Sequence, residues 1–368
     1  MFSTAPPWRT PQTVLFLRAA QQRMLTGLLL RPQAARIRTE QSKQAHESEQ
    51  TMLTETAAST TSEIQSPAAQ GDLEALLHPV QELVFFEQYW NRKALYIPGR
   101  PDKFSGLFDR AAFDRAVHNC LDLKVGFTDE NGWPGHFNIK PEQVPEMLAG
   151  GKTVCASVID PRDPILTAFL NRIAKNFAVA GNFFFNSYLS PDGGGFGLHL
   201  DHHPVSILQI AGQKRWWYSP EPGLKEVITN VSFPKDRDAL KLPWVTVTRP
   251  REEDLCEVVL SPGDVLYMPK GTWHRAQAIG GSLGLTLAME SVAPLDLIQT
   301  ALFPHINKVE LRSHVPGYWW RSAQNGMPLE LERTFEAALG ELRVAVNSMT
   351  PADLYRVWLQ VRTMRSGK

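Results

Sequence analysis

The spacing of apolar and polar positions differs between regions of the chain. Helical spacing follows residue 71, a pattern of short β-type runs separated by Pro and Gly begins at residue 182, and helical spacing returns after Pro294. The segments expected as helices are 72–76, 83–89, 113–120, 165–177, 297–311, 329–346 and 351–364. The segments expected as strands are 94–97, 124–127, 153–159, 183–189, 205–211, 214–218, 244–247, 257–260, 265–268 and 284–289.

This pattern predicts the fold class and the domain organisation. Several short strands with turn signals between them, and no helices among them, favour a barrel or jelly roll. The expected fold is therefore mainly β with α, with N-terminal helices and a helical C-terminal region. The folded domain is expected to span residues 72–293, and the helical region residues 294–368.

Residues 1–71 differ from the rest and are expected to be a disordered leader and linker. The first 39 residues contain six arginines and no acidic residue, and residues 14–30 could form an amphipathic helix. That combination is typical of a mitochondrial transit peptide. The alternatives are a plain disordered leader, or a true start at Met24 or Met52. A cytoplasmic location is expected, and a mitochondrial one if the leader directs import.

Composition narrows the class of protein. Lys plus Arg number 38 and Asp plus Glu also number 38, so the formal net charge is zero. This charge balance does not indicate strong binding to nucleic acid. The longest early apolar run, residues 25–30, is too short to cross a membrane. The three cysteines lie far apart with no CxxC pair, which favours free thiols over a zinc cage.

Two short motifs carry the candidate chemistry. His199 and Asp201 lie two residues apart, so both would project from one face of a strand. The stretch PGDVLYMPKGTWH ends in His274 and combines two turns with a short apolar strand. In an antiparallel barrel the strand that starts at His274 can fold back beside the one that carries His199. Two imidazoles and one carboxylate on one face of a metal leave three octahedral positions open, as in non-haem Fe(II) oxygenases.

Each motif also has an ordinary structural explanation. A lone HxD is common and is usually a surface pair or a cap, but the Gly-x5-Pro-x-Gly-x2-His spacing is more specific. Many cupins have a second histidine where Asp201 stands, and here no fourth ligand follows it. His202 and His203 could line the mouth of a pocket, or they could be simple surface histidines.

From about Asp72 to Val292, some 60% of its length, the chain resembles JmjC/cupin-type 2-oxoglutarate oxygenases, closest to the ribosomal oxygenase branch. The matching segments are FFEQYWNRKALYIPG, NSYLSPDGGGFGLHLDHH, VSILQIAGQKRWWYSP and PGDVLYMPKGTWHRA. The resemblance implies a double-stranded β-helix. It also implies Fe(II) bound by His199, Asp201 and His274 as the catalytic metal ligands, with 2-oxoglutarate and O2 as cosubstrates.

The resemblance further implies residues that bind the cosubstrate. A basic residue thirteen after the aspartate, Lys214 here, would hold the distal carboxylate of 2-oxoglutarate. On a strand either Lys214 or Arg215 can point into the barrel but not both, and a buried lysine requires an anion. Asn186 and Tyr188 resemble polar contacts of the family, and Thr286 could add a hydroxyl contact, although each is also an ordinary strand residue.

The activity expected from the resemblance is hydroxylation of a C–H bond in a side chain of a protein or peptide, with release of succinate and CO2. Three alternatives stay open: N-demethylation or small-molecule hydroxylation at the same iron site, a non-oxidative metal-binding cupin, and an interaction module on an inactive barrel. A ribosomal protein is one candidate substrate. About seventy residues follow Pro294, which fits a helical dimerisation region but is short for the family's winged-helix domain as well. A homodimer through these helices is one expectation, and a tail that covers one sheet is the other.

Overall fold

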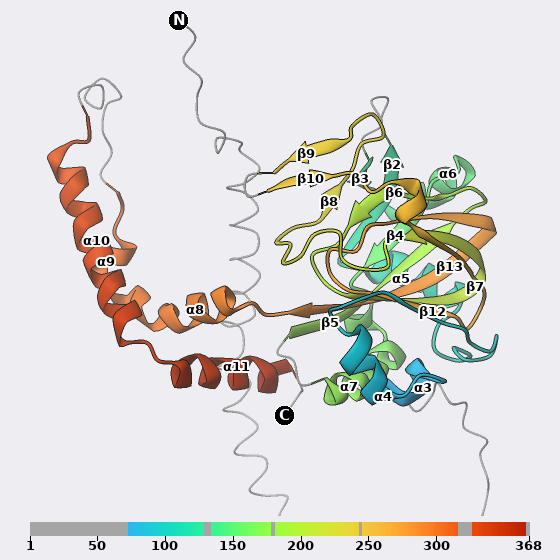
Figure 1. Cartoon of the computed structure of the whole chain (residues 1–368), viewed down its shortest axis with the longest axis horizontal. Coiled ribbons are helices and arrows are strands. Elements are labelled where there is room, and N and C mark those ends of the chain that lie inside the picture. Colours follow the sequence, from blue (N-terminus) through green and yellow to red (C-terminus); the bar gives the residue numbers. More distant parts are fainter. Residues whose placement is uncertain (1–72, 129–133, 178–180, 243–244, 316–325, 366–368) are drawn as a thin grey trace, which may run out of the picture. The chain divides into compact units, whose positions relative to one another are not determined.

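The computed structural model describes residues 73–128, 134–177, 181–242, 245–315 and 326–365, so the expected leader lies outside the described residues (Figure 1). The helices are α3 (Leu73–Leu77), α4 (Glu82–Val84), α5 (Arg110–Asn119), α6 (Val144–Ala149), α7 (Pro164–Asn176), α8 (Pro294–Leu302), α9 (Val309–Arg312), α10 (Leu329–Ser348) and α11 (Pro351–Arg365), and a π-helical turn, η2 (Phe85–Tyr89), extends α4. The strands are β1 (Leu95–Ile97), β2 (Asp122–Thr128), β3 (Pro134–Asn138), β4 (Val154–Ser157), β5 (Gly181–Ser190), β6 (Gly195–Leu200), β7 (Val205–Tyr218), β8 (Val231–Ser232), β9 (Ala239–Lys241), β10 (Thr246–Thr248), β11 (Cys256–Leu260), β12 (Val265–Met268) and β13 (His274–Ser291).

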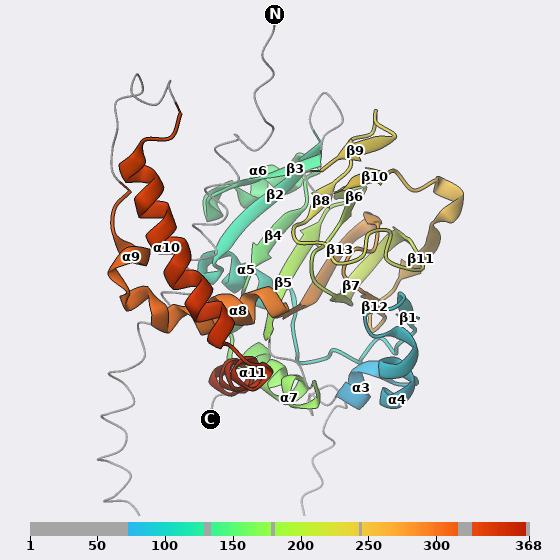
Figure 2. The ribbon, with the colours of Figure 1, turned by 60° about the vertical axis from the view of Figure 1, so that its left-hand side comes forward.

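Two long strands, β7 and β13, hold the sheet together. They pair antiparallel along most of their length, and the main strand order is β1-β12-β7-β13-β5-β4-β2-β3. The far half of β7 also pairs with β11, and the first half of β13 pairs with β6, which in turn pairs with β8. Because the same two strands serve both halves, the sheet folds over on itself, as Figure 2 shows. This confirms the predicted mainly β fold with helices, in the form of a double-stranded β-helix.

The corner of this fold depends on glycine. Gly212 has a φ of +65°, and opposite it Gly280 and Gly281 have φ values of +67° and +110°. A Cβ on Gly212 would lie 2.1 Å from the backbone oxygen of Gly281, so no other residue fits without moving the backbone. Register shifts in the β7–β13 ladder occur at this point, which lets both strands bend without ending.

The hydrophobic core lies between one face of the large sheet and the N-terminal helices. Alternate residues of β13, Leu283, Leu285 and Leu287, are buried in the same cluster as Phe113 of α5 and Leu166 of α7. The opposite face of these strands lines the interior of the β-helix. Helix starts are fixed locally: the Asp109 and Asp163 side chains accept hydrogen bonds from the first turns of α5 and α7.

Several expected elements are confirmed. Strand β12 spans residues 265–268 as expected, and helices α5, α7, α10 and α11 lie close to the ranges expected for them. Three expectations are wrong. Residues 205–211 and 214–218 are one strand, because Gly212 makes a bulge and not a turn. The strand expected to start at His274 and the strand expected over 284–289 are one continuous strand, β13. The expected helix 297–311 is broken, because Pro304 lies in a 3-10 turn between α8 and α9. Strands β3, β8 and β9 and helix α6 were not expected.

The C-terminal helices follow directly from the last strand. Helix α8 begins at Pro294, and α11 contacts both α8 and the barrel strand β5. The described residues 239–242 and 245–247 belong to a separate compact unit, and β9 in this unit pairs with β10. Over the part of the chain that the structure describes, every helix is too short or too polar to cross a bilayer. The predicted boundaries of the three regions stay predictions.

Candidate metal centre

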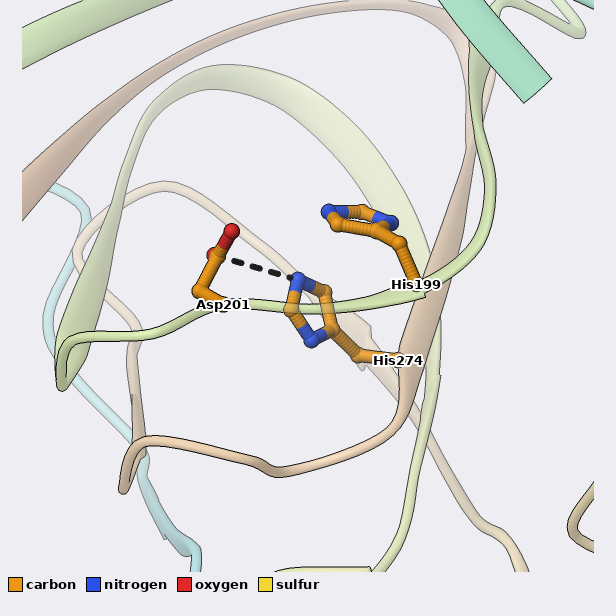
Figure 3. A group of neighbouring side chains, drawn as sticks. All are labelled: His199, Asp201 and His274. Atoms are coloured by element: carbon orange, nitrogen blue, oxygen red, sulfur yellow. Dashed lines mark ion pairs between the residues drawn. The ribbon is translucent and has the colours of Figure 1, made fainter. Parts of the chain in front are cut away.

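His199, Asp201 and His274 converge on one another, although 72 residues lie between Asp201 and His274 in the sequence (Figure 3). His199 on β6 and His274, the first residue of β13, are direct cross-strand partners, as the sequence predicted. Their imidazole centroids are 4.1 Å apart, and Nε2 of His274 lies 3.6 Å from Oδ2 of Asp201. One ligand atom from each side chain lies within 4.8 Å of the others.

Backbone contacts orient both imidazoles in the same way. Nδ1 of His199 lies 2.8 Å from the carbonyl oxygen of Gly197, and Nδ1 of His274 lies 2.9 Å from that of Thr272. A proton on each Nδ1 satisfies these carbonyls and leaves the Nε2 lone pairs free. Histidine ligands of metals are commonly held in this way by their second nitrogen.

The pKa shifts of His274 and Asp201 also suit a divalent cation. Burial, and next the neighbouring His199, lower the pKa of His274 to about 4, so its imidazole is neutral at pH 7. Burial raises the pKa of the Asp201 carboxyl, but the facing imidazoles of His199 and His274 together outweigh it and hold the pKa below its usual value. The result is a neutral imidazole at His274 beside the Asp201 carboxylate.

This donor set fits an octahedral transition metal with open positions. Metal–ligand bonds of about 2.0–2.2 Å bring ligand atoms on one ion to within roughly 4 Å of each other, so small side-chain rotations suffice here. Among the described residues this is the one place where three such groups meet. Asp201 lies one residue beyond the end of β6, and its carboxylate reaches the same centre as the His199 imidazole.

Lys214 points into the interior, and its neighbour Arg215 points out. The Lys214 side chain is 5% exposed, whereas Arg215 pairs with Glu257 at 3.4 Å on the outer surface. Nζ of Lys214 donates to Oγ of Ser190 at 3.0 Å, and no acidic side chain within the described ranges forms an ion pair with it. Burial lowers the pKa of Lys214 to about 8. A buried cation with a hydroxyl partner and no acid is a site for an anion.

The other three predicted cosubstrate residues lie on the same interior face. Asn186 and Thr286 are cross-strand partners on β5 and β13. The Oδ1 atom of Asn186 already accepts a hydrogen bond from the Val158 N–H at 2.9 Å, while the Thr286 hydroxyl has no hydrogen-bond partner in the described part of the protein. The ring of Tyr188 lies 5.9 Å from the Lys214 ammonium. Their role in cosubstrate binding stays a prediction.

Aromatic rings connect the lysine to the metal ligands. Phe196 of β6 packs edge-on against Tyr188 at 5.7 Å and lies 6.3 Å from the His199 ring. Trp216 lies 6.0 Å from the His274 ring and 5.8 Å from the Lys214 ammonium. Lys214 and the three ligands therefore share one interior with apolar walls.

Two histidines and one serine lie close to these groups. From the sequence, His202 and His203 could be residues at the mouth of a pocket or simple surface histidines. In the structure His202 contacts Glu290 and Asn230, whereas His203 is half-buried against Phe184. Ser190, the hydroxyl partner of Lys214, was missed, although it has the same strand parity as the predicted contacts on β5. That parity was the available signal.

Comparison with known proteins agrees with this geometry. Residues 166–296 match the JmjC domain family, and this range contains the three converging side chains and Lys214. Over this range the protein is therefore similar to JmjC domains. Its fold is shared by a solved structure of YcfD, a ribosomal oxygenase from Escherichia coli, in complex with cobalt and 2-oxoglutarate. That match has a TM-score of 0.50 and 16% identity over 77% of this chain and 71% of the other.

Two relatives are similar in sequence. The uncharacterized protein YxbC of Bacillus subtilis (strain 168) is 24% identical over 308 residues, which cover 79% of this chain and 92% of the relative. Ribosomal oxygenase 1 of Danio rerio is 27% identical over 234 residues, which cover 59% of this chain. The match spans only 39% of that longer relative. The protein is thus similar over 234 residues to a protein named a ribosomal oxygenase.

Proposed function

We propose that the protein is an Fe(II)- and 2-oxoglutarate-dependent dioxygenase that hydroxylates a C–H bond in a side chain of a protein or peptide. The observation that carries this proposal is the placement of Lys214, a buried cation without an acid, in the same interior as His199, Asp201 and His274. A JmjC-domain match over residues 166–296 supports it. A fold neighbour that binds cobalt and 2-oxoglutarate supports the choice of cosubstrate.

Each interior residue has a distinct task in this proposal. His199, Asp201 and His274 hold the ferrous ion, with both imidazoles aimed by their Nδ1 contacts. The bound ion supplies activation of O2 coupled to oxidative decarboxylation of 2-oxoglutarate to succinate and CO2. Lys214 binds the distal carboxylate of 2-oxoglutarate, assisted by the Ser190 hydroxyl. The rings of Tyr188, Phe196 and Trp216 exclude water from the space between them.

The substrate class is the finer part of the proposal. The relative from Danio rerio is named a ribosomal oxygenase, which makes a ribosomal protein the first candidate substrate. The test is incubation of the protein with Fe(II), 2-oxoglutarate and purified ribosomal proteins, followed by mass spectrometry and a succinate assay. Addition of one oxygen atom to a peptide, with matching succinate, is the expected result. Loss of a methyl group with formaldehyde would indicate demethylation, and no succinate with any substrate would contradict the proposal.

A homodimer through the C-terminal helices is proposed on the basis of α10. Phe335, Leu339, Leu342 and Val346 follow one another at intervals of four, three and four residues, so they form one stripe of the helix. All four are between 36% and 46% exposed. A second copy of the same stripe, related by a two-fold axis, would cover it.

The oligomeric state tests that proposal directly. Leu339→Glu should shift the protein from dimer to monomer in analytical ultracentrifugation. Val344→Glu, on the opposite side of α10 and 65% exposed, is the matched control and should stay dimeric. A monomeric wild-type protein at micromolar concentration would overturn the dimer without affecting the proposed chemistry.

The location in the cell is also part of the proposal. A cytoplasmic enzyme is proposed, with mitochondria as the destination if residues 1–39 direct import. Fusions of a fluorescent protein to the full-length protein and to a version without residues 1–39 would separate these outcomes.

A further inference from the structure

Asp201 differs from its two partners in how its backbone is held. His199 and His274 lie in strands, where the ladder fixes them, but Asp201 lies in the turn that follows β6. The β6–β8 ladder pairs His199 with Ser232 and Leu200 with Val231. The next pair in this register would be Asp201 and Asn230, and the strand ladder stops before it.

The side chain of Asn230 takes over where the ladder stops. Its Oδ1 accepts a hydrogen bond from the backbone N–H of His202 at 2.9 Å and lies 2.6 Å from Nδ1 of the same residue. One amide oxygen therefore fixes both the backbone and the ring of the residue that follows Asp201. By accepting this hydrogen bond, the Asn230 side chain satisfies a backbone N–H just past the end of the strand ladder.

Other contacts hold the remaining sides of the turn. The carbonyl oxygen of Asp201 accepts from the Gly271 N–H at 2.8 Å, and that of Pro204 accepts from the Met289 N–H at 3.0 Å. Nε2 of the His202 ring lies 3.7 Å from a carboxylate oxygen of Glu290. Of the three hydrogen bonds described here that the backbone of residues 201–204 makes, the one donated by the His202 N–H has a side chain as its partner, and the other two join backbone atoms.

We propose that Asn230 is a positioning residue that aims the Asp201 carboxylate at the metal through His202. This inference rests on the proposed function, because it assumes that Asp201 is a metal ligand. Loss of the Asn230 oxygen would leave the His202 N–H and Nδ1 without their partner, and the Asp201 side chain would sample orientations that do not face His199 and His274. Partners that orient metal ligands affect metal affinity even though they do not touch the metal.

The experiment is a calorimetric titration of Mn(II) into the metal-free full-length protein and three variants, without substrate. Asn230→Ala removes the acceptor and should raise the Kd for Mn(II) about five- to tenfold, which corresponds to the loss of one or two modest hydrogen bonds. Asn230→Asp keeps an acceptor oxygen in place and should restore the Kd to within about twofold of wild type. Ile228→Ala is the matched control in the same loop, because this side chain is 70% exposed and should leave the Kd unchanged.

The outcomes separate this inference from the function on which it rests. Wild-type binding of Mn(II), with an unchanged Kd for Asn230→Ala, would overturn the positioning role and leave the metal site intact. A weaker Kd in both Asn230→Ala and Asn230→Asp would also overturn it, because the acceptor oxygen would then not be the cause. No binding by the wild-type protein would overturn the proposed function itself. Melting curves of the metal-free variants confirm that each titration measures a folded protein.

Discussion

The two ends of the β-helix interior differ in the charge of the ligand that each is suited to bind. At one end, two imidazoles and a carboxylate face one another with their donor atoms within 4.8 Å. At the other, the Lys214 ammonium is buried with a serine hydroxyl and two aromatic rings as neighbours. The first end is complementary to a cation and the second to an anion.

This difference shows why both ends have to be considered together. A metal at the first end leaves coordination positions that a small chelating anion can fill, and the second end then binds the far charge of the same molecule. A dicarboxylate with a keto group next to one carboxylate satisfies both ends at once. Neither end alone distinguishes an oxygenase from a simple metal-binding barrel.

The largest effect is expected when the cation end is broken. Asp201→Ala removes the one anionic ligand, so Mn(II) affinity should fall by more than about 100-fold, beyond the range seen when a ligand's supporting partner is lost. Turnover should fall to the background rate. Calorimetry and succinate release measure the two effects. Asp114→Ala, a surface carboxylate on α5 that pairs with Arg110, is the control and should match wild type.

Breaking the anion end should produce a different signature. Lys214→Met keeps the volume and removes the charge, so the KM for 2-oxoglutarate should rise about 30-fold or more, as expected when a buried charge pair loses one partner. The ligand-free protein should become more stable by about 1 kcal/mol, because an unpaired buried cation is removed. Steady-state kinetics and urea unfolding measure these changes. Arg215→Met, the outward-facing neighbour, should change neither; an equal effect of both substitutions would contradict the anion site.

The pH dependence of cosubstrate binding provides a milder test. Burial lowers the pKa of Lys214 to about 8, so the unliganded protein loses this charge as the pH rises above 8. Binding of 2-oxoglutarate to the Mn(II)-loaded protein should therefore be strongest below pH 8 and weaken by up to about tenfold per pH unit above it. Lys214→Arg, which stays charged, should not show this decline. A flat profile for the wild-type protein from pH 7 to 9.5 would contradict a role for the lysine charge.

The smallest effect is expected at Thr286. Its hydroxyl lies in the interior without a hydrogen-bond partner among the described residues, so Thr286→Val removes a contact that only a ligand would make. The KM for 2-oxoglutarate should rise about two- to fivefold, the equivalent of one modest hydrogen bond. Thr248→Val, at an exposed position of β10, is the control and should leave the KM unchanged. Thr167 is not used as a control, because its hydroxyl donates a hydrogen bond to the Asp160 carbonyl oxygen.

Much of the fold could be predicted from hydrophobic periodicity, and the failures share one cause. Strand β12 and the amphipathic helices were found because each has a strong local pattern. Strands β7 and β13 were split or shortened because glycines at 212, 280 and 281 look like turns in sequence. Only pairing between two bulged strands, a long-range feature, shows that each strand runs on through these glycines.

The candidate site was predictable in its residue types and less so in its geometry. The spacing of His199, Asp201 and His274 identified three side chains that the structure brings together. Strand parity left Lys214 and Arg215 as alternatives, and the structure decides between them by the burial of Lys214. Asn230 carries no motif, because its relation to the site depends on where the β6–β8 ladder ends.

The most direct test of the two-ended interior is a calorimetric titration of 2-oxoglutarate into the wild-type protein, with and without Mn(II). The account predicts saturable binding of one molecule per protomer when Mn(II) is present and much weaker binding when it is absent, since the ligand is then held only by Lys214. Equal affinity in the two titrations, or no binding in either, would contradict it.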